Sequence, residues 1–383
     1  MANGDFPRQN GGDGLIGLLN RHGVVLLALL LLVAMPMLLD TFRLSLMAKY
    51  LSLAFCAVGI VLIWGYGGIL SLGQGAFFGL GSYMMAMFLK LEASAVTDSS
   101  TSALSAFFGQ AGLPDFMSWN SVEKLPWWWE PFHHVWFTIP AILIIPPLLA
   151  FILGYVNFRR RVGEVYFSII TLALSAIMAI VIVGQQGLTG GINGITDFKT
   201  FMGWNLDPDG AKLIMYFITA VLLLLCVLVG GFILRSRLGK VLVAIRDRED
   251  RVRFSGYDPA VYKAFIFAVA ALFSSIGGAL FTLQVGLASP SLVGIVPSIE
   301  MVIYAAVGGR LSVIGAVYGT VLVSYGKTFF SENFVQYWLY MIGALFIVVV
   351  MFLPGGLASF LDKLRPVRRE QVPVGGALNI EGN

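Results

Sequence analysis

Charged side chains are scarce in this sequence. Asp, Glu, Lys and Arg make up 12% of the 383 residues, whereas hydrophobic residues make up 58%. A soluble globular domain carries about a quarter charged residues and about half apolar ones. The composition therefore excludes an ordinary soluble domain and predicts an integral membrane protein.

Cysteine and histidine are almost absent as well. Both cysteines, Cys56 and Cys226, lie within apolar runs, so we expect packing residues rather than a disulfide framework or a cysteine metal site. The three histidines, His22, His133 and His134, lack the spacing of metal ligands. The net charge of +4 is too small and too dispersed for a nucleic-acid-binding surface. We predict no metal site and no nucleic-acid partner.

The sequence also lacks residues that would supply energy, either by binding a nucleotide or by coupling to protons. Gly326, Lys327 and Thr328 resemble the end of a phosphate-binding loop, but Val321 stands where that motif requires its first glycine. A proton-coupled carrier needs several carboxylates within the membrane, whereas Glu300 is the main one here. We therefore expect energy from other chains, and neither a catalytic residue nor a cofactor in this one.

Long apolar runs dominate what remains. A helix needs about 20 apolar residues to cross a hydrocarbon core of about 30 Å. Ten runs qualify: 24–39, 47–64, 67–89, 135–156, 165–184, 213–234, 264–288, 292–309, 311–328 and 335–353. Because prolines 290 and 297 break the uncharged stretch 264–299, we expect one crossing there, followed by a short or re-entrant segment. The sequence predicts an all-α integral membrane protein of about ten transmembrane helices with glycine-rich broken segments.

The distribution of Lys and Arg predicts the orientation. With both termini in the cytoplasm, most of the 25 basic residues fall on cytoplasmic segments, as the positive-inside rule requires. The run 24–39 has no Ala-x-Ala cleavage site, so we interpret it as the first span. The predicted regions are a cytoplasmic tail (1–22), a membrane domain (23–356, with a periplasmic loop at 90–134 and a cytoplasmic loop at 235–263) and a second cytoplasmic tail (357–383).

The predicted periplasmic loop is acidic and contains a tryptophan cluster at 127–129. Tryptophan favours the boundary between membrane and water. We therefore expect an aromatic anchor there rather than a site that stacks a ligand.

The cytoplasmic loop 235–263 contains an amphipathic helix that we expect to end near Gly256. Its apolar residues recur at i, i+3, i+4 and i+7: Leu238, Val241, Leu242 and Ile245. We expect the chain to offer nothing that covers this stripe, so that the helix docks into a groove on another protein. The acidic residues Asp247, Glu249 and Asp250 argue against a purely lipid-directed helix.

Two glycine-rich runs, 65–83 and 308–319, share a pattern of small residues. Small residues let helices approach closely and let a helix break within the membrane. The similarity between the two runs is compatible with an internal repeat, although close packing alone also explains it.

Few polar residues occur within the predicted spans, and these are candidates for a solute path. Glu300 precedes Arg310 by about 15 Å of helix, so it serves either as a structural partner of Arg310 or as part of the path. The predicted path residues are Ser71, Gln74, Gln185, Asn193, Glu300 and Tyr304. Uncharged amides and hydroxyls suit a small neutral polar solute, although the stretch 185–195 also has the composition of a turn.

Four motifs together resemble the membrane subunits of bacterial ABC importers for branched-chain amino acids. They are LSLGQGAFFG at 70–79, LTGGING at 188–194, RLGKVLVAIRD at 237–247 and AVGGR at 306–310. Within that family the chain is similar to the urea permeases, through the segments 113–116, 126–129, 165–171, 251–254 and 290–300.

The resemblance implies a heterodimer with a sister permease, two ATP-binding cassette subunits that hold ATP and Mg, and a periplasmic solute-binding protein. It also implies a location in the bacterial inner membrane and a coupling helix in the loop 235–263. The implied coupling residues are Leu238, Gly239, Val241, Leu242, Ala244, Ile245, Arg246 and Gly256.

We therefore expect a permease subunit for urea or a short amide that acts by alternating access. The alternatives are a branched-chain amino acid permease, a self-contained channel or secondary carrier, and a membrane assembly protein without transport activity.

Overall fold

The computed structural model describes residues 23–100, 113–198 and 200–334, with scattered positions up to 351. The two predicted cytoplasmic tails, 1–22 and 357–383, lie outside the described residues, as does much of the predicted last span. The elements, in chain order, are η1 (Leu30–Ala34), α2 (Met35–Leu38), α3 (Thr41–Ile60), η2 (Val61–Tyr66), α4 (Gln74–Ser100), α6 (Asp115–Trp119), η3 (Glu130–His133), α7 (Val135–Arg159), α8 (Glu164–Gly184), α9 (Gln186–Thr189), η4 (Gly191–Asn193), β1 (Thr200–Phe201), β2 (Trp204–Asn205), α10 (Asp209–Arg235), α11 (Arg237–Phe254), α12 (Pro259–Val285), η5 (Pro290–Leu292), α13 (Ile295–Gly308) and α14 (Val313–Asn333).

Six helices in the described part of the chain are long and apolar enough to cross a membrane. They are Thr41–Tyr66, Val135–Arg159, Glu164–Gly184, Asp209–Arg235, Pro259–Val285 and Val313–Asn333. Two shorter apolar helices, Gly23–Leu38 and Ile295–Gly308, occupy the first and eighth predicted spans. The all-α membrane fold is therefore confirmed.

The break predicted after the seventh span is also present. Helix α12 ends at Val285, and Gly286 takes a left-handed conformation that stops it. The short turn η5 follows, and then α13, whose 14 residues extend about 21 Å. A helix of that length is shorter than the hydrocarbon core, so α13 is the expected short segment.

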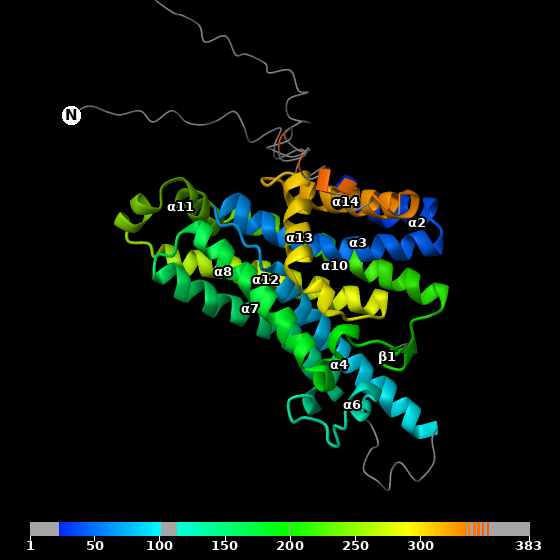
Figure 1. Ribbon diagram of the computed structural model, residues 1–383. Coiled ribbons are helices and arrows are strands. Elements are labelled where there is room, and N and C mark those ends of the chain that lie inside the picture. Colours follow the sequence, from blue (N-terminus) through cyan, green and yellow to red (C-terminus); the bar gives the residue numbers. More distant parts are fainter. Residues whose placement is uncertain are drawn as a thin grey trace, which may run out of the picture.

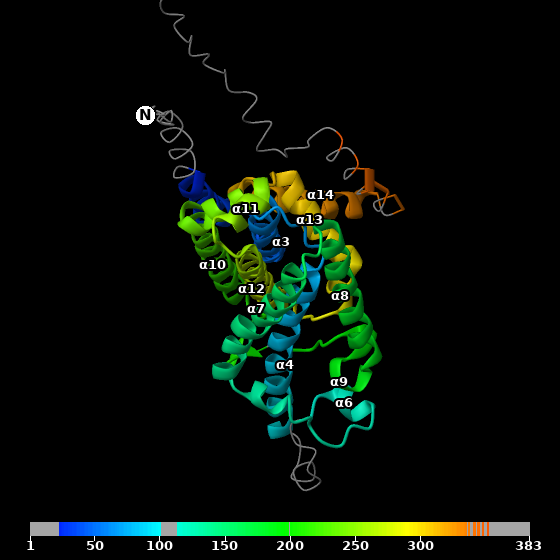
Figure 2. The same ribbon diagram turned by 90° about the vertical axis from the view of Figure 1, so that its left-hand side faces the viewer.

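Helix α12 lies at the centre of the bundle, where it packs against α3, α4 and α7 (Figures 1 and 2). Helix α10 covers α3, and α13 packs against both α14 and α3. The two cysteines are buried within this packing, as expected. Many side chains of α7 and α8 are exposed and apolar, including Ile144 and Ile180. Such surfaces suit lipid or another membrane subunit.

The segments predicted to be cytoplasmic gather at one end of the bundle. Lys263, at the start of α12, lies over the ring of Phe158 at the end of α7. Arg246 of α11 contacts Gly65 at the end of η2, and the Tyr66 hydroxyl donates a hydrogen bond to the Leu311 carbonyl. This end carries the basic segments, and we call it the α11 end.

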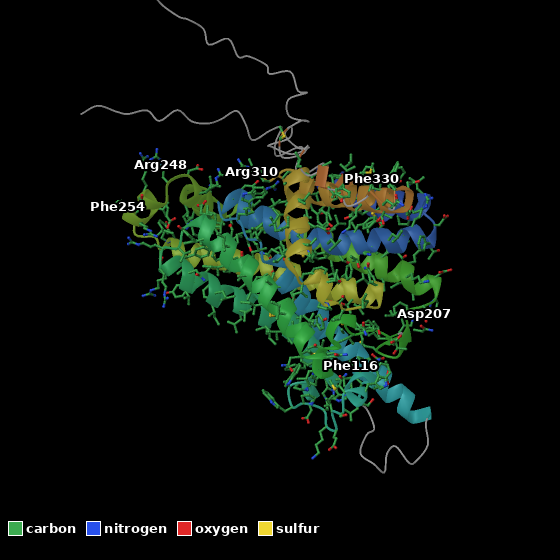
Figure 3. The ribbon with its side chains drawn as sticks, viewed as in Figure 1. Phe116, Asp207, Arg248, Phe254, Arg310 and Phe330 are labelled. Carbon is green, nitrogen blue, oxygen red and sulfur yellow. The ribbon has the colours of Figure 1, made fainter. Side chains whose placement is uncertain are left out.

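The segments predicted to be external gather at the opposite end. The hairpin β1–β2 pairs Thr200 with Asn205, and the amides of its turn donate hydrogen bonds to the carboxylate of Glu92 from α4. An isolated bridge between Ile195 and Ala288 ties two further loops together there. The two ends are well separated in Figure 3, where Arg248 and Phe254 lie at one end of the molecule and Asp207 lies at the other.

Candidate functional site

A broken helix lies at the centre of the candidate site. The chain leaves helical geometry after Tyr66 and resumes it at Gln74. Because exposed backbone groups are costly within a membrane, the break needs partners. Helix α8 provides them: the Thr171 hydroxyl accepts a hydrogen bond from the Leu72 amide at 3.1 Å, and the Ser168 hydroxyl donates one to the Leu70 carbonyl at 2.6 Å.

Ser71 and Gln74 lie together beside this break, and both are completely buried. The Gln74 side-chain oxygen accepts a 2.8 Å hydrogen bond from the Ser274 hydroxyl of α12. The Gln74 amide nitrogen lies 3.5 Å from the Ser71 hydroxyl. In this conformation the pair connects α4 to α12 within a packed region.

A further pair of hydroxyls links α8 to α13. The Ser298 hydroxyl lies 3.1 Å from the Ser175 hydroxyl and 2.9 Å from the Gly294 carbonyl, and its single proton can donate to either. Both serines are buried. The hydroxyls of α8 therefore reach both the break before α4 and the short helix α13.

Glu300 and Tyr304 lie together on α13, but the partner of Glu300 is Lys327. The Lys327 Nζ lies 2.8 and 2.9 Å from the two carboxylate oxygens of Glu300. The Tyr304 hydroxyl donates a weaker bond to Glu300 at 3.4 Å. The expectation of a structural pair with Arg310 was wrong, since Arg310 follows the end of α13 whereas Lys327 comes back alongside it on α14.

The pair Glu300–Lys327 lines a cavity of about 420 Å³, which we call the outer cavity. It lies between α3, the last turns of α12, the segment η5–α13 and α14. Its lining residues are Leu46, Lys49, Tyr50, Leu53, Phe281, Leu292, Pro297, Glu300, Met301, Tyr304, Ser324, Lys327, Thr328, Ser331 and Glu332. Charged, hydroxyl and apolar groups therefore share one cavity.

Gln185 and Asn193 lie elsewhere, on the loop that follows α8 at the end opposite α11. Both side chains are exposed. The loop turns at Gly190, Gly191 and Gly194, which all have left-handed φ values. The six predicted path residues thus form three groups: a buried pair, a cavity pair and an exposed loop.

The predicted amphipathic helix is present as α11, and it ends at Phe254, two residues before Gly256. Its apolar stripe, however, is covered by the chain itself. Leu242 is 0% exposed and Ile245 is 2% exposed, because α11 packs against α10, η2 and α12. The expectation that nothing in this chain covers the stripe was therefore wrong.

The exposed face of α11 is mostly charged. It carries Ala244 and a group of ionic residues: Arg237, Lys240, Asp247, Arg248 and Arg251. Phe254 ends this face and is 93% exposed. Leu238 and Val241 are half-buried, and Gly239 is buried. We call the exposed set the α11 face, and it replaces the apolar stripe as the surface open to a partner.

Arg246 connects α11 to the broken helix. Its guanidinium donates a 2.7 Å hydrogen bond to the Gly65 carbonyl, in the last turn before the break. Such a carbonyl has no partner within its own helix, and a cation is favourable at a helix C-terminus. Arg246 also pairs with Asp247 at 3.1 Å.

The backbone of α11 leaves helical geometry at Arg248, and Glu249 fixes the part that follows this kink to α12. Its carboxylate pairs with Lys263 at 2.7 Å and with Arg253 at 2.6 Å. Burial alone raises the pKa of this carboxyl, but the two cations outweigh burial and hold the pKa below its usual value.

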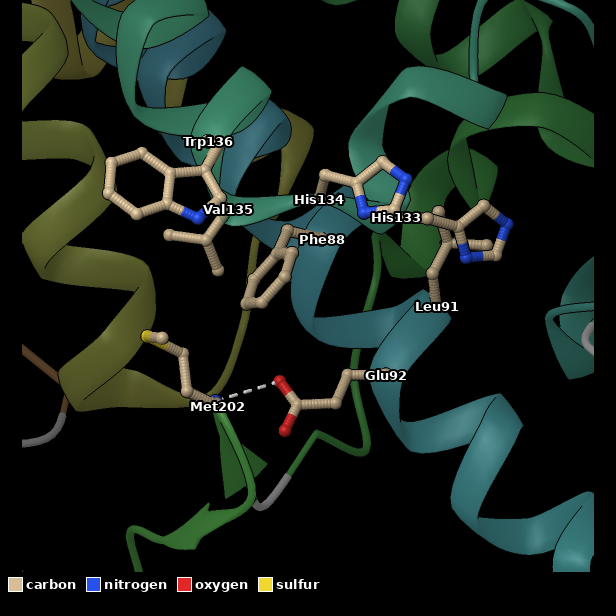
Figure 4. A pocket seen from close by; sticks show the side chains of 8 residues that line it. All are labelled: Phe88, Leu91, Glu92, His133, His134, Val135, Trp136 and Met202. Carbon is tan, nitrogen blue, oxygen red and sulfur yellow. Dashed lines mark hydrogen bonds between the residues drawn. The ribbon is translucent and has the colours of Figure 1, made fainter.

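At the other end, a cavity of about 480 Å³ lies beside the hairpin turn. Figure 4 shows the side chains that line it. Glu92 lies at its edge and accepts bonds from the amides of Met202 and Gly203, at 3.0 and 2.5 Å. Both oxygens of the Glu92 carboxylate therefore bind the turn of the hairpin. His133 lines the same cavity, and its pKa is lowered by burial and by His134, against the opposing effect of Glu130.

The tryptophan cluster divides between two roles. Trp127 is 81% exposed, as an interfacial anchor requires. Trp129 is completely buried and packs against Trp128 and Phe116. The anchor interpretation therefore fits Trp127 and is wrong for Trp129.

Sequence reasoning missed three sets of polar residues. The hydroxyls Ser168, Thr171 and Ser175 carry a detectable signal, since they recur at i, i+3 and i+7 on one face of a predicted span. Lys327 was considered only within its glycine-lysine-threonine motif. Lys49, which lines the outer cavity from α3, had no signal of its own, because a single lysine in a predicted span does not indicate a cavity between helices.

The family described as branched-chain amino acid transport system, permease component, matches residues 42–350. The chain belongs to this family.

Among curated proteins, the chain is 23% identical over 360 residues to the high-affinity branched-chain amino acid transport system permease protein LivM of Salmonella typhimurium, and equally to LivM of Escherichia coli. Each alignment covers 88% of this chain and 75% of the relative. The ribose import permease protein RbsC of Haemophilus influenzae is 24% identical over 202 residues, covering 50% of this chain and 59% of that protein. No solved structure matches the chain significantly.

The family assignment and the apolar helices agree on the general class. This is a multi-pass membrane permease of ABC type, and a transport component rather than an enzyme. These comparisons do not identify urea as the solute, and we treat the urea assignment below as a proposal.

Proposed function

We propose that this chain is a permease subunit of an ATP-driven importer in the bacterial inner membrane, with both termini in the cytoplasm. It moves a small polar solute from the periplasm to the cytoplasm by alternating access. ATP and Mg bind to two separate ATPase subunits. A sister permease and a periplasmic binding protein complete the assembly.

The observation that carries this proposal is the link from the α11 face to the broken helix. A partner that displaces α11 also displaces Arg246, which holds the Gly65 carbonyl. The break that follows is held by hydroxyls of α8, and Ser175 of α8 bonds to Ser298 of α13. Movement at the α11 end therefore has a continuous set of contacts that leads into the membrane.

Urea or another short amide is our first solute candidate. The resemblance of five segments to the urea permeases supports it. Uncharged groups that exchange hydrogen bonds with an amide, such as those of Ser71, Gln74 and Ser298, surround the break. A buried polar group left unpaired costs about 1–3 kcal/mol, so such groups select a solute that matches them.

Branched-chain amino acids are the second candidate. The named function of the LivM relatives supports it. The outer cavity supports it as well, because cationic, anionic and apolar side chains line it together.

Uptake in a deletion strain separates the two candidates. Strains with and without this chain are supplied with labelled urea or labelled leucine, and each solute is tested as a competitor of the other. Loss of urea uptake alone supports the first candidate, and loss of leucine uptake alone supports the second. Unchanged uptake of both, with the partner subunits present, contradicts the import of either.

A further inference from the structure

The outer cavity contains a lysine that forms no ion pair with an acidic residue of the described part of the chain. Lys49 lines the cavity from α3 and is partly buried. Within the described part of the chain, the ion pairs are those of Lys90, Lys212, Arg246, Arg253, Lys263 and Lys327, and none includes Lys49. Its Nζ lies 5.7 Å from the centroid of the Phe281 ring. An aromatic ring attracts a cation but does not neutralise it.

The neighbouring charges do not compensate for Lys49. Glu300 already binds Lys327 through both carboxylate oxygens. Lys327 is close enough to repel Lys49. Glu332 lines the cavity but is exposed, and the next acidic residue in the sequence is Asp362. An ionisable group within a membrane is costly and usually faces a partner or a solute path.

Six apolar side chains form part of the cavity walls, beside five hydroxyl groups. The apolar side chains are Leu46, Leu53, Phe281, Leu292, Pro297 and Met301. Urea has neither a negative charge for Lys49 nor an aliphatic group for these walls. A solute that carries a carboxylate beside an aliphatic chain has both.

We propose that the outer cavity binds such a solute, and that Lys49 is the residue that holds its carboxylate. The apolar side chains of the cavity receive the aliphatic chain of the same solute. The inference rests on the second candidate of the proposed function and assigns a residue to its specificity. Leucine is the probe that follows from this chemistry.

Leucine binding to the full chain tests the proposal directly. The chain is purified with its sister permease in phosphatidylcholine nanodiscs, and binding of tritiated leucine is measured. We expect K49M to weaken binding at least tenfold, the scale of one lost charge-assisted hydrogen bond, and K49R to retain most of it. The matched control is K212M, which removes an exposed lysine of α10 that pairs with Asp209. This control should bind leucine as the wild type does. Leucinamide, which lacks the carboxylate, should compete poorly.

Two results would overturn the proposal. One is wild-type leucine affinity in K49M, and the other is competition by leucinamide as strong as by leucine itself. In the same experiment, nanodiscs that contain phosphatidylglycerol test for a lipid phosphate at Lys49. If K49M reduces only the retained phosphatidylglycerol and leaves leucine binding unchanged, the lysine serves a lipid and the proposal fails. Failure of ATP-driven uptake with leucine binding intact would instead count against the proposed function.

Discussion

The ion pair between Glu300 and Lys327 shows how sequence distance misleads at the scale of single residues. Glu300 and Arg310 are ten positions apart, whereas Lys327 follows Glu300 by 27. Packing of α13 against α14 brings the distant lysine close. The sequence identified Glu300 as unusual, but only the arrangement of the two helices identifies its partner.

We predict that the single substitutions Glu300→Gln and Lys327→Met each destabilise the protein by about 1–3 kcal/mol. Loss of one partner of a buried pair costs about 3–5 kcal/mol, and the value is reduced here because both side chains are partly exposed. The double variant should recover part of the loss, because it leaves no unpaired charge. Thermal unfolding in detergent measures all three variants. Additive losses in the double variant would show that the two residues do not interact.

Glu249 of α11 predicts a pH dependence of stability. Because the pKa of Glu249 is lowered in the folded protein, its pairing stabilises the fold above the unfolded pKa of about 4.3. That contribution is lost as the pH falls through the lower folded pKa. We expect Glu249→Gln to lower the melting temperature at pH 7, and the difference from the wild type to shrink as the pH is lowered through this range. A difference that stays constant over the same range would exclude the assigned ionisation.

At the scale of helices, glycine sets how closely α4 and α12 pack. A Cβ atom at Gly278 of α12 would lie 1.9 Å from the Phe78 carbonyl oxygen of α4. Real Cβ atoms essentially never approach a backbone atom so closely, so the two helices would have to separate. The residue pattern predicted close packing in the glycine-rich run but did not identify which helix it faces.

Gly278→Ala should therefore lower the melting temperature clearly, and the loss of packing between two central helices should cost about 1–3 kcal/mol. Gly231→Ala is the matched control on α10, because a Cβ there meets no atom within 4 Å. That variant should be neutral or stabilised by up to about 1 kcal/mol, the helix preference of alanine over glycine. Equal effects of the two substitutions would argue against the close contact.

Helix α11 gives a second comparison, between two adjacent positions. Ala244 is exposed on the α11 face, whereas Ile245 is buried against the chain. We expect Ala244→Asp to leave folding intact and to abolish co-purification of the ATPase subunits and transport. Ile245→Asp buries a charge without a partner and should reduce the amount of folded protein. Copurification of both ATPases with Ala244→Asp at the wild-type yield would contradict docking at this face.

The sequence predicted helices well where a long apolar run is bounded by charge. The predicted spans 135–156 and 165–184 correspond to α7 and α8 within a few residues. The glycine-rich run 65–83 indicated that a helix could break there, but the predicted span began at 67, whereas α4 begins at Gln74. The end of α11 near Gly256 was predicted from that glycine. Prediction from the sequence failed for the apolar stripe of α11, for the ion pair of Lys327 with Glu300, and for the place of Lys49 in the lining of the outer cavity. Burial and ion pairing depend on which elements meet, and periodicity within one element does not contain that information.

At the scale of the whole molecule, the two ends differ in chemistry. The α11 end contains the basic segments and the Arg246 contact to the break, and the opposite end contains the hairpin, the acidic segment before α7 and the loop with Gln185 and Asn193. The outer cavity lies between helices that join these ends. This polarity suits a permease that receives solute at one end and is driven from the other.

The most direct test of this account is transport in proteoliposomes. The purified chain alone is compared with the complete assembly of both permeases, both ATPases and the binding protein. We predict ATP-dependent uptake of labelled urea or leucine by the complete assembly, with no uptake by this chain alone under a proton or sodium gradient. Saturable uptake by this chain alone, driven by either gradient, would contradict the account and identify a self-contained carrier.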